Sequence, residues 1–207
     1  METAAFLSAT PVVDWDNRDV LAFSRQLADG RTSQADVVRG CFEWVRDEVQ
    51  HTVDHGLEVI TCNASDVLSE RSGFCYSKSH LLAALLRANG IPTGFVYQRL
   101  ALDAEGTTFC LHGLNAVWLP EDGWIRIDAR GRRDNLRAEF DPPREVLPFA
   151  CSLPGEQIFP FVLAEPLPLV VDALRQYRTR EELELHLPDT SSLDGLSMTS
   201  VAVPAGA

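Results

Sequence analysis

The sequence predicts an α+β fold in which a helical N-terminal part precedes a small antiparallel sheet. The first observation is that apolar side chains recur at helical spacing over 17–28 and 33–49. The second is a leucine- and alanine-rich helical stretch that starts at Cys75. The third is a set of strand-like runs rich in Val, Ile, Phe and Trp, at 93–100, 109–119 and 124–128. Helices followed by hairpin-linked strands are typical of an α+β architecture, with the helix from Cys75 packed on the sheet.

The N-terminal third is expected to be helical after a poorly constrained arm. This arm comprises residues 1–16, and Trp15 is expected to anchor its end. Gly30 ends the first helix, and either Thr32 or Ser33 caps the second. Helical order therefore begins near residue 17.

A short helix and a longer one follow an irregular segment. Ser65 is expected to cap a short helix over 66–70. The helix from Cys75 is expected to end at Asn89-Gly90, a left-handed stop, because Pro92 blocks its continuation.

The C-terminal part is expected to be less regular. We predict one catalytic domain over 17–186, with a Pro-rich extension from about residue 140 that crosses the surface. Short helices are predicted over 167–177 and 180–185. The Ser-, Thr-, Gly- and Pro-containing tail, 187–207, is predicted to be disordered.

Composition and charge exclude several classes of partner. The chain has 207 residues and a net charge of −12, with a pI near 4.8. Such a field repels nucleic acid and anionic membrane, so neither is expected as a partner. No window approaches the ~18 apolar residues that a membrane span requires.

The cysteines indicate a reducing environment rather than a disulfide framework. They number five, without CxxC spacing, at positions 41, 62, 75, 110 and 151. A disulfide scaffold or zinc ribbon is not expected from this pattern. The segment 1–8 lacks the basic and apolar regions of a signal peptide, so the predicted location is the cytoplasm.

Cys75 is the candidate nucleophile. It lies at the first turn of a predicted helix, where unpaired backbone N–H groups and the helix dipole favour a thiolate. His112 lies within the strand 109–119, and Asp128 ends the next strand. If the 120–123 turn pairs these strands with residue 118 near 124 or 125, Asp128 comes within diagonal reach of His112. Nucleophile, base and orienting carboxylate then form a cysteine triad.

The motifs around these residues resemble those of the transglutaminase-like superfamily. They are Gly-Phe-Cys75 before a helix that ends in Asn-Gly-Ile-Pro, Leu-His112 through Val-Trp-Leu-Pro, and Gly-Trp-Ile-Arg-Ile-Asp128. The resemblance spans roughly residues 33 to 131. It implies a papain-type fold and a Cys, His, Asp order of catalytic residues.

The resemblance also implies a mechanism. Cys75 would attack an amide or peptide carbonyl, His112 would transfer protons, and Asp128 would orient the imidazole. The oxyanion would be held by the Cys75 backbone N–H and one further donor. The candidates for that donor are Gln98, Asn63 and Trp44.

Two pairs of residues depart from the usual family pattern. Tyr76-Ser77 follows Cys75, and Gly113-Leu114 follows His112. With Cys110, which shares the face of His112, the residues Tyr76, Gly113 and Leu114 are the candidates for the pocket rim. The expected substrate is a peptide or a small amide, and no cofactor or metal is expected.

Other interpretations remain open at this point. The chain can instead be a catalytically silent module that binds peptide or protein, or a redox sensor in which Cys110 resolves Cys75. His51 and His55, with Asp54 and Cys62 nearby, suggest a metal site, but their segment does not look helical enough to align two histidines. A basic cluster is either a solvated loop or an anion contact near the site: Arg130, Arg132, Arg133 and Arg137.

Overall fold

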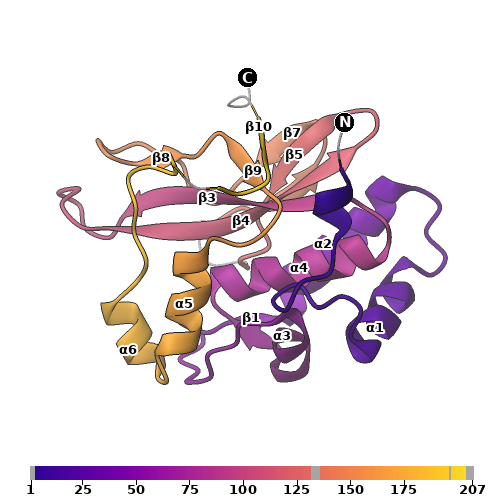
Figure 1. The fold of residues 1–207 in the computed structure, drawn as a ribbon, viewed down its shortest axis with the longest axis horizontal. Helices are drawn as coiled ribbons and strands as arrows, with labels where there is room; N and C mark the ends of the chain where they lie inside the picture. Colours follow the sequence, from indigo (N-terminus) through magenta and orange to yellow (C-terminus); the bar gives the residue numbers. More distant parts are fainter. Residues whose placement is uncertain (1–2, 132–135, 196, 204–207) are drawn as a thin grey trace.

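The computed structural model describes residues 3–131, 136–195 and 197–203, and in it a layer of helices lies against one face of a sheet (Figure 1). The helices are α1 (Arg18–Ala28), α2 (Gln34–Glu48), α3 (Ala64–Glu70), α4 (Cys75–Ala88), α5 (Pro168–Gln176) and α6 (Arg180–Leu185). None of the described helices is long and apolar enough to cross a membrane. The predicted α+β class is confirmed.

The main sheet has six strands in the order β10-β9-β3-β4-β5, with β8 also paired to β3. All of its pairings are antiparallel. Its strands are β3 (Thr93–Ala101), β4 (Phe109–Leu119), β5 (Gly123–Ile127), β8 (Gln157–Ile158), β9 (Phe161–Leu163) and β10 (Ser200–Ala202). Two small ladders complete the fold, β1 (Gln50–His51) with β2 (Ser72–Gly73) and β6 (Glu139–Asp141) with β7 (Arg144–Val146).

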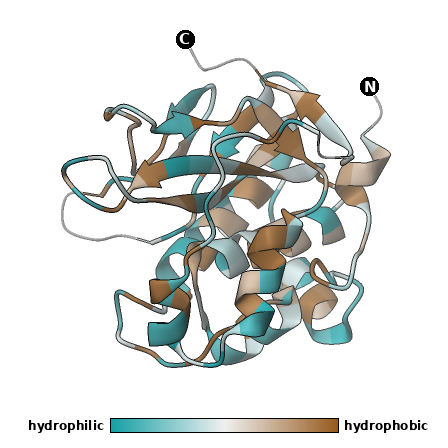
Figure 2. Ribbon diagram, turned by 60° about the vertical axis from the view of Figure 1, so that its left-hand side comes forward, coloured by the Kyte–Doolittle hydropathy of each residue, from teal (hydrophilic) through white to brown (hydrophobic). Residues whose placement is uncertain are grey.

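Helix α4 is the central element (Figure 1), because it packs against α1, α2 and α3 and against strands β3 and β4 of the sheet. Figure 2 shows that both the helices and the strands carry hydrophobic segments. The leucines of α4, at 81, 82, 85 and 86, are fully buried. Each such side chain contributes about 1.5–3 kcal/mol by leaving water. The helix ends as predicted, because Gly90 adopts a left-handed conformation with φ of +72°. The packing therefore fixes the position of Cys75 at the start of this helix.

The two faces of β4 pack into different cores, as strand alternation requires. Leu111 and Val117 belong to the main core with α4. Leu114 and Ala116 belong to a second core on the other face, together with Phe6 from the 3₁₀ helix η1 (Ala4–Leu7). His112 shares the backbone face of Leu114 and Ala116, as the sequence predicts.

Both terminal segments are more ordered than predicted. In the arm, Phe6 is buried and the indole of Trp15 donates to the Leu7 carbonyl at 3.0 Å, which confirms the anchoring role of Trp15. In the tail, β10 pairs with β9, and the Leu111 N–H donates to the Pro188 carbonyl at 2.7 Å. The prediction of disorder was wrong for these residues because free sheet edges supply hydrogen bonds that composition does not reveal. Residues 1–2, 132–135, 196 and 204–207 lie outside the described part, and with them Arg132 and Arg133 of the predicted basic cluster.

The start of α3 also differs from the prediction. Asn63, rather than Ser65, is the N-cap, and the Asn63 N–H donates to the Asp66 carboxylate at 3.3 Å. Ser65 instead donates through its backbone N–H to Asp14 at 3.0 Å. Ser65 thus ties the arm to α3.

Candidate active site

Cys75 is the first residue of α4, and a short ladder holds the chain that leads into it. The Gln50 N–H donates to the Arg71 carbonyl at 2.9 Å, and the Thr52 N–H donates to the Gly73 carbonyl at 3.1 Å. Phe74 is the N-cap and makes no side-chain cap. The first N–H groups of α4 therefore have no partner within the helix.

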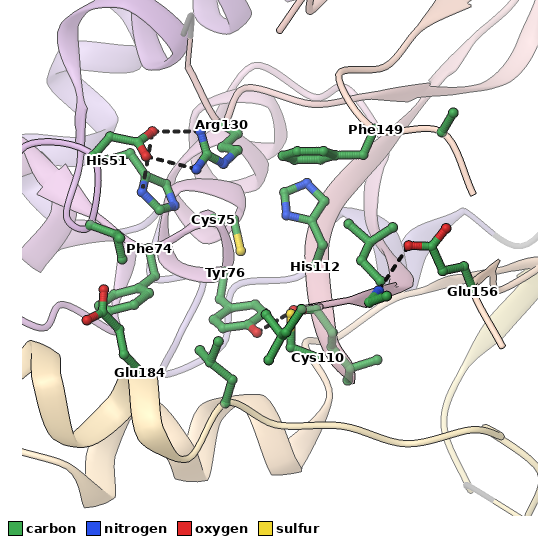
Figure 3. Close-up of a pocket in the computed structure, with 18 residues that line it drawn as sticks. His51, Phe74, Cys75, Tyr76, Cys110, His112, Arg130, Phe149, Glu156 and Glu184 are labelled. Atoms are coloured by element: carbon green, nitrogen blue, oxygen red, sulfur yellow. Dashed lines mark hydrogen bonds and ion pairs between the residues drawn. The ribbon is translucent and has the colours of Figure 1, made fainter. Parts of the chain in front are cut away.

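Cys75 and His112 line the same cavity, which has a volume of about 520 Å³ (Figure 3). Apolar side chains form much of its wall, among them Val53, Phe74, Leu100, Leu102, Phe149 and Leu187. Val53 and Leu102 are 36% and 56% exposed, unusual values for large apolar residues. The wall thus combines these apolar side chains with polar and charged ones, among them His51, Asp54, Arg130, Glu156 and Glu184.

His112 and Asp128 form a close, buried pair. The Nε2 atom of His112 lies 2.6 Å from Oδ2 of Asp128, and the side chains are 6% and 1% exposed. The other carboxylate oxygen accepts the Arg130 backbone N–H at 2.8 Å. With Nε2 engaged, Nδ1 is the ring nitrogen of His112 that remains for Cys75.

The surroundings of His112 favour its protonated form. Burial lowers its pKa, but the negative charges of Asp128 and Cys75 and hydrogen bonds to both outweigh that effect and raise the pKa to about 10. At neutral pH the imidazole is therefore a cation beside the thiol. This is the charge arrangement of an activated cysteine.

The β4–β5 register explains the proximity of His112 and Asp128. Trp118 pairs with Trp124, as predicted, and the ladder ends where Asn115 pairs with Ile127. Asp128 is thus the first residue to leave the sheet, diagonally across from His112. Sequence-based reasoning placed this pair correctly.

Phe149 covers His112 and was not identified from the sequence. Its ring centroid lies 4.9 Å from that of His112, nearly perpendicular to it, and 5.6 Å from the guanidinium carbon of Arg130. The ring thus contacts two cations, which its π-face stabilises. Phe149 comes from the Pro-rich extension, where no periodic pattern indicates an inward side chain.

A second histidine–carboxylate pair lines the cavity on another side. Nδ1 of His51 lies 3.8 Å from Oδ2 of Asp54. Both oxygens of Asp54 also accept the Arg130 guanidinium, at 2.6 and 3.0 Å. Burial and the charge of Arg130 lower the pKa of His51 to about 3, although Asp54 opposes them. His51 is therefore neutral at physiological pH.

The three predicted donors for an oxyanion do not line the cavity. The Gln98 side chain donates to the Phe149 carbonyl at 3.0 Å, Asn63 caps α3, and the ring of Trp44 packs on that of Phe23 at 4.5 Å. These side chains are occupied in folding contacts, so their proposed role is not supported.

Two of the four predicted rim residues line the cavity and two do not. Tyr76 and Cys110 are in the wall. Leu114 is in the second core, and Gly113 lies against Tyr76. A Cβ atom at position 113 would lie 3.0 Å from the ring of Tyr76 and 3.4 Å from its Cα atom. The two departures from the family pattern therefore touch each other, and glycine at 113 makes room for the aromatic ring at 76.

A family model described as the transglutaminase-like superfamily matches residues 21–129, just over half of the chain. The chain belongs to this superfamily. The match includes Cys75, His112 and Asp128, and it confirms the resemblance predicted from the motifs.

Similar proteins include a protein-glutamine gamma-glutamyltransferase from Pseudomonas aeruginosa, 38% identical over 65 residues. That match spans 28% of this chain and 10% of the relative. A solved structure of a proposed cysteine protease from Cytophaga hutchinsonii has 21% identity and a TM-score of 0.49, covering 62% of this chain and 42% of that one. The periplasmic domain of TgpA from Pseudomonas aeruginosa has 23% identity and a TM-score of 0.44, covering 59% and 48%. This chain thus spans less than half of each of these relatives.

Proposed function

We propose that this transglutaminase-like protein hydrolyses an amide or peptide bond through a thioacyl intermediate on Cys75. The observation that carries the proposal is that His112, paired with buried Asp128 at 2.6 Å, lines one cavity together with Cys75. This arrangement supplies a nucleophile, a proton carrier and an orienting carboxylate.

The proposed reaction has two stages. The sulfur of Cys75 adds to the carbonyl carbon, and the carbonyl π electrons move to oxygen. When the tetrahedral intermediate collapses, the C–N bond breaks and His112 gives its proton to the leaving nitrogen. In the second stage water adds to the thioester carbon, His112 takes the proton of the water, and the acid leaves as the C–S bond breaks.

The proposed substrate is a peptide or a small amide with an apolar side chain near the scissile bond. The apolar wall and the volume of about 520 Å³ support this class. Among the charged wall residues, Arg130 is paired with Asp54, and Glu156 accepts backbone N–H groups of its own loop, so neither is free to bind a charged substrate. The cytoplasmic location predicted from the sequence stays a prediction.

Transfer of the acyl group to an amine is a second candidate. The relative from Pseudomonas aeruginosa is named a protein-glutamine gamma-glutamyltransferase. The two reactions share the thioester and differ in whether water or an amine opens it. Adding hydroxylamine during turnover separates them, because an amine-transfer enzyme converts most of the thioester to hydroxamate at millimolar hydroxylamine, whereas a hydrolase still releases mainly the acid.

The test of the proposed function is the pH dependence of Cys75 labelling by iodoacetamide, read by mass spectrometry of the Cys75 peptide. We expect rapid labelling at pH 6, where an ordinary thiol with a pKa of about 8.5 reacts slowly. Cys151 is exposed and serves as the internal reference thiol. His112→Ala should remove the rapid phase at Cys75 only.

Turnover of a panel of N-acyl amino acid amides and short peptides completes the test, with Cys75→Ala as the control. Hydrolysis that disappears in Cys75→Ala supports the proposal. Binding without turnover, together with ordinary labelling of Cys75, would contradict it and favour the silent peptide-binding module.

A further inference from the structure

The proposed reaction requires hydrogen-bond donors for the oxyanion, and one donor is not yet assigned. The Cys75 backbone N–H at the start of α4 is available. Stabilising a developing negative charge in a buried cavity generally takes a second donor. Since Gln98, Asn63 and Trp44 do not line the cavity, this donor has to come from another residue.

The geometry of the reaction defines where that donor must lie. The leaving nitrogen has to point toward His112 to receive its proton. The oxyanion, on the same tetrahedral carbon, therefore points away from His112. Figure 3 shows the imidazoles of His51 and His112 on opposite sides of Cys75, so His51 lies on the side where the oxyanion forms.

The backbone holds His51 next to the nucleophile. His51 pairs with Gly73 in the parallel β1–β2 ladder, two residues before Cys75. Its ring contacts Phe74 edge-on, with centroids 6.1 Å apart. His51 is 7% exposed and lines the cavity that holds Cys75 as well as a second, smaller pocket behind Asp54.

The orientation of the ring turns Nε2 toward the cavity. Nδ1 faces Asp54 at 3.8 Å, which is beyond hydrogen-bond length, and this nitrogen has no hydrogen-bond partner. Figure 3 shows the other ring nitrogen on the Cys75 side. At 3.8 Å, Asp54 is too far away to hold the imidazole proton at Nδ1 by a hydrogen bond. The proton is available at Nε2, where a developing negative charge attracts it.

We propose that His51 Nε2–H is the second oxyanion donor of this site, acting with the Cys75 backbone N–H. The inference rests on the proposed acyl-transfer function and names a catalytic residue that it leaves open. Its neutral state suits the role, because burial and Arg130 lower the pKa of His51 to about 3. A neutral donor adds no positive charge to repel the imidazolium of His112.

The other polar groups near Cys75 are committed elsewhere. The guanidinium of Arg130 makes two bonds to Asp54 and lies over Phe149. Lys78, one turn along α4, is 1% exposed and donates to the Val49 carbonyl. The hydroxyl of Tyr76 donates to the Leu111 carbonyl. Among the described cavity residues, His51 is thus the side chain best placed to donate.

The experiment compares two probes of the same thiol in the full chain. N-acetyl-leucinal adds to Cys75 and forms a hemithioacetal, in which the former carbonyl oxygen occupies the oxyanion position. Iodoacetamide alkylates Cys75 by displacing iodide and forms no such oxygen. The aldehyde's dissociation constant is measured from the protection that it gives against alkylation of the Cys75 peptide.

The variants are His51→Gln and His51→Asn. Glutamine places its amide nitrogen near the position of Nε2, whereas asparagine places it near that of Nδ1. We expect His51→Gln to bind the aldehyde within about threefold of the native protein and His51→Asn to bind it about 10- to 100-fold more weakly. The rate of alkylation without aldehyde should be similar in all three proteins.

Three results would overturn the inference. One is equal aldehyde affinity in the native protein and both variants. Another is an equal loss of aldehyde affinity in both variants. Thermal unfolding of the native protein and of each variant is recorded to show that all three are folded. The third is a lack of protection in the native protein. Rapid alkylation of Cys75 at pH 6 in that last case would leave the activated thiol of the proposed function intact, so the two failures are distinguishable.

Discussion

Two histidine–carboxylate pairs flank Cys75, and the same residue types have opposite charge states. The pKa of His112 is raised to about 10 beside Asp128, whereas that of His51 is lowered to about 3 beside Asp54. Both imidazoles are buried. The difference therefore comes from the geometry of each pair, from the other partners of the carboxylates, and from Cys75, which also raises the pKa of His112.

Arg130 produces much of this asymmetry. Its guanidinium neutralises Asp54, which lies 3.8 Å from His51. Only its backbone N–H donates to Asp128, whose other carboxylate oxygen lies 2.6 Å from His112. The comparison indicates that a carboxylate raises the pKa of a neighbouring histidine less when an arginine guanidinium also binds that carboxylate.

The largest effect on activity is expected from removing His112, the protonated histidine of the two. His112→Ala should lower kcat/KM by about 10⁴-fold or more, because both the imidazolium and the proton carrier disappear. His55→Ala, at an exposed histidine near the cavity, is the matched control and should retain activity. Retained turnover in His112→Ala would contradict its assigned role.

Asp128→Asn tests the carboxylate that distinguishes the two pairs. The amide cannot stabilise the imidazolium, so the pKa of His112 should fall and kcat should drop on the order of 10²–10⁴-fold. NMR titration of His112 and steady-state kinetics measure the two effects. Asp122→Asn, in the exposed β4–β5 turn, is the control. An unchanged His112 titration would show that Asp128 is not the cause of the raised pKa.

Arg130→Gln should make the two pairs more alike. Without the guanidinium, the charge of Asp54 is no longer neutralised, and the pKa of His51 should rise from about 3 toward its ordinary value of about 6.5. We expect the acid limb of the kcat/KM profile to move to higher pH, since a protonated His51 places a second cation beside Cys75. Arg137→Gln, which breaks a surface pair with Glu139, should leave the profile unchanged.

Stability should depend on pH with opposite signs for the two histidines. The raised pKa of His112 makes a contribution that is fully present below about pH 6.5 and is lost as pH rises through about 10. The lowered pKa of His51 destabilises the fold as pH falls from about 6.5 toward 3, because the unfolded state then binds the proton first. Urea unfolding at pH 5, 7 and 9 should show less loss above pH 7 in His112→Ala than in the native protein.

A smaller effect is expected at the contact between the two departures from the family pattern. Gly113→Ala introduces a Cβ 3.0 Å from the Tyr76 ring and should destabilise the protein by about 1–3 kcal/mol. Truncating the ring in Tyr76→Ala should cancel most of the added cost of Gly113→Ala in a double-mutant cycle. Purely additive effects in urea unfolding would show that the contact does not couple them.

The nucleophile helix and the β4–β5 hairpin were predictable because their signals are local. Helical spacing ended by Asn89-Gly90 defined α4, and a four-residue turn with alternating side chains gave the register that brings Asp128 to His112. Motif order then identified the family.

His51 and Phe149 were harder to place because their positions depend on long-range packing. His51 belongs to a two-residue strand whose partner lies 22 positions away, too short for any periodic signal. Phe149 lies in the irregular connection that follows the short strand β7, outside any regular element. The sequence analysis did place His51 and Asp54 together, as a candidate metal site. It gave no indication that the guanidinium of Arg130 binds the carboxylate of Asp54.

The measurement that tests the central claim most directly is an NMR titration of the histidine side chains in the native protein, with His51→Gln and His112→Ala for assignment. Between pH 4.5 and 9 we predict that His112 keeps the signals of an imidazolium and that His51 keeps those of a neutral imidazole. Titration of both rings near pH 6.5 would contradict the opposite charge states on which the proposed chemistry depends.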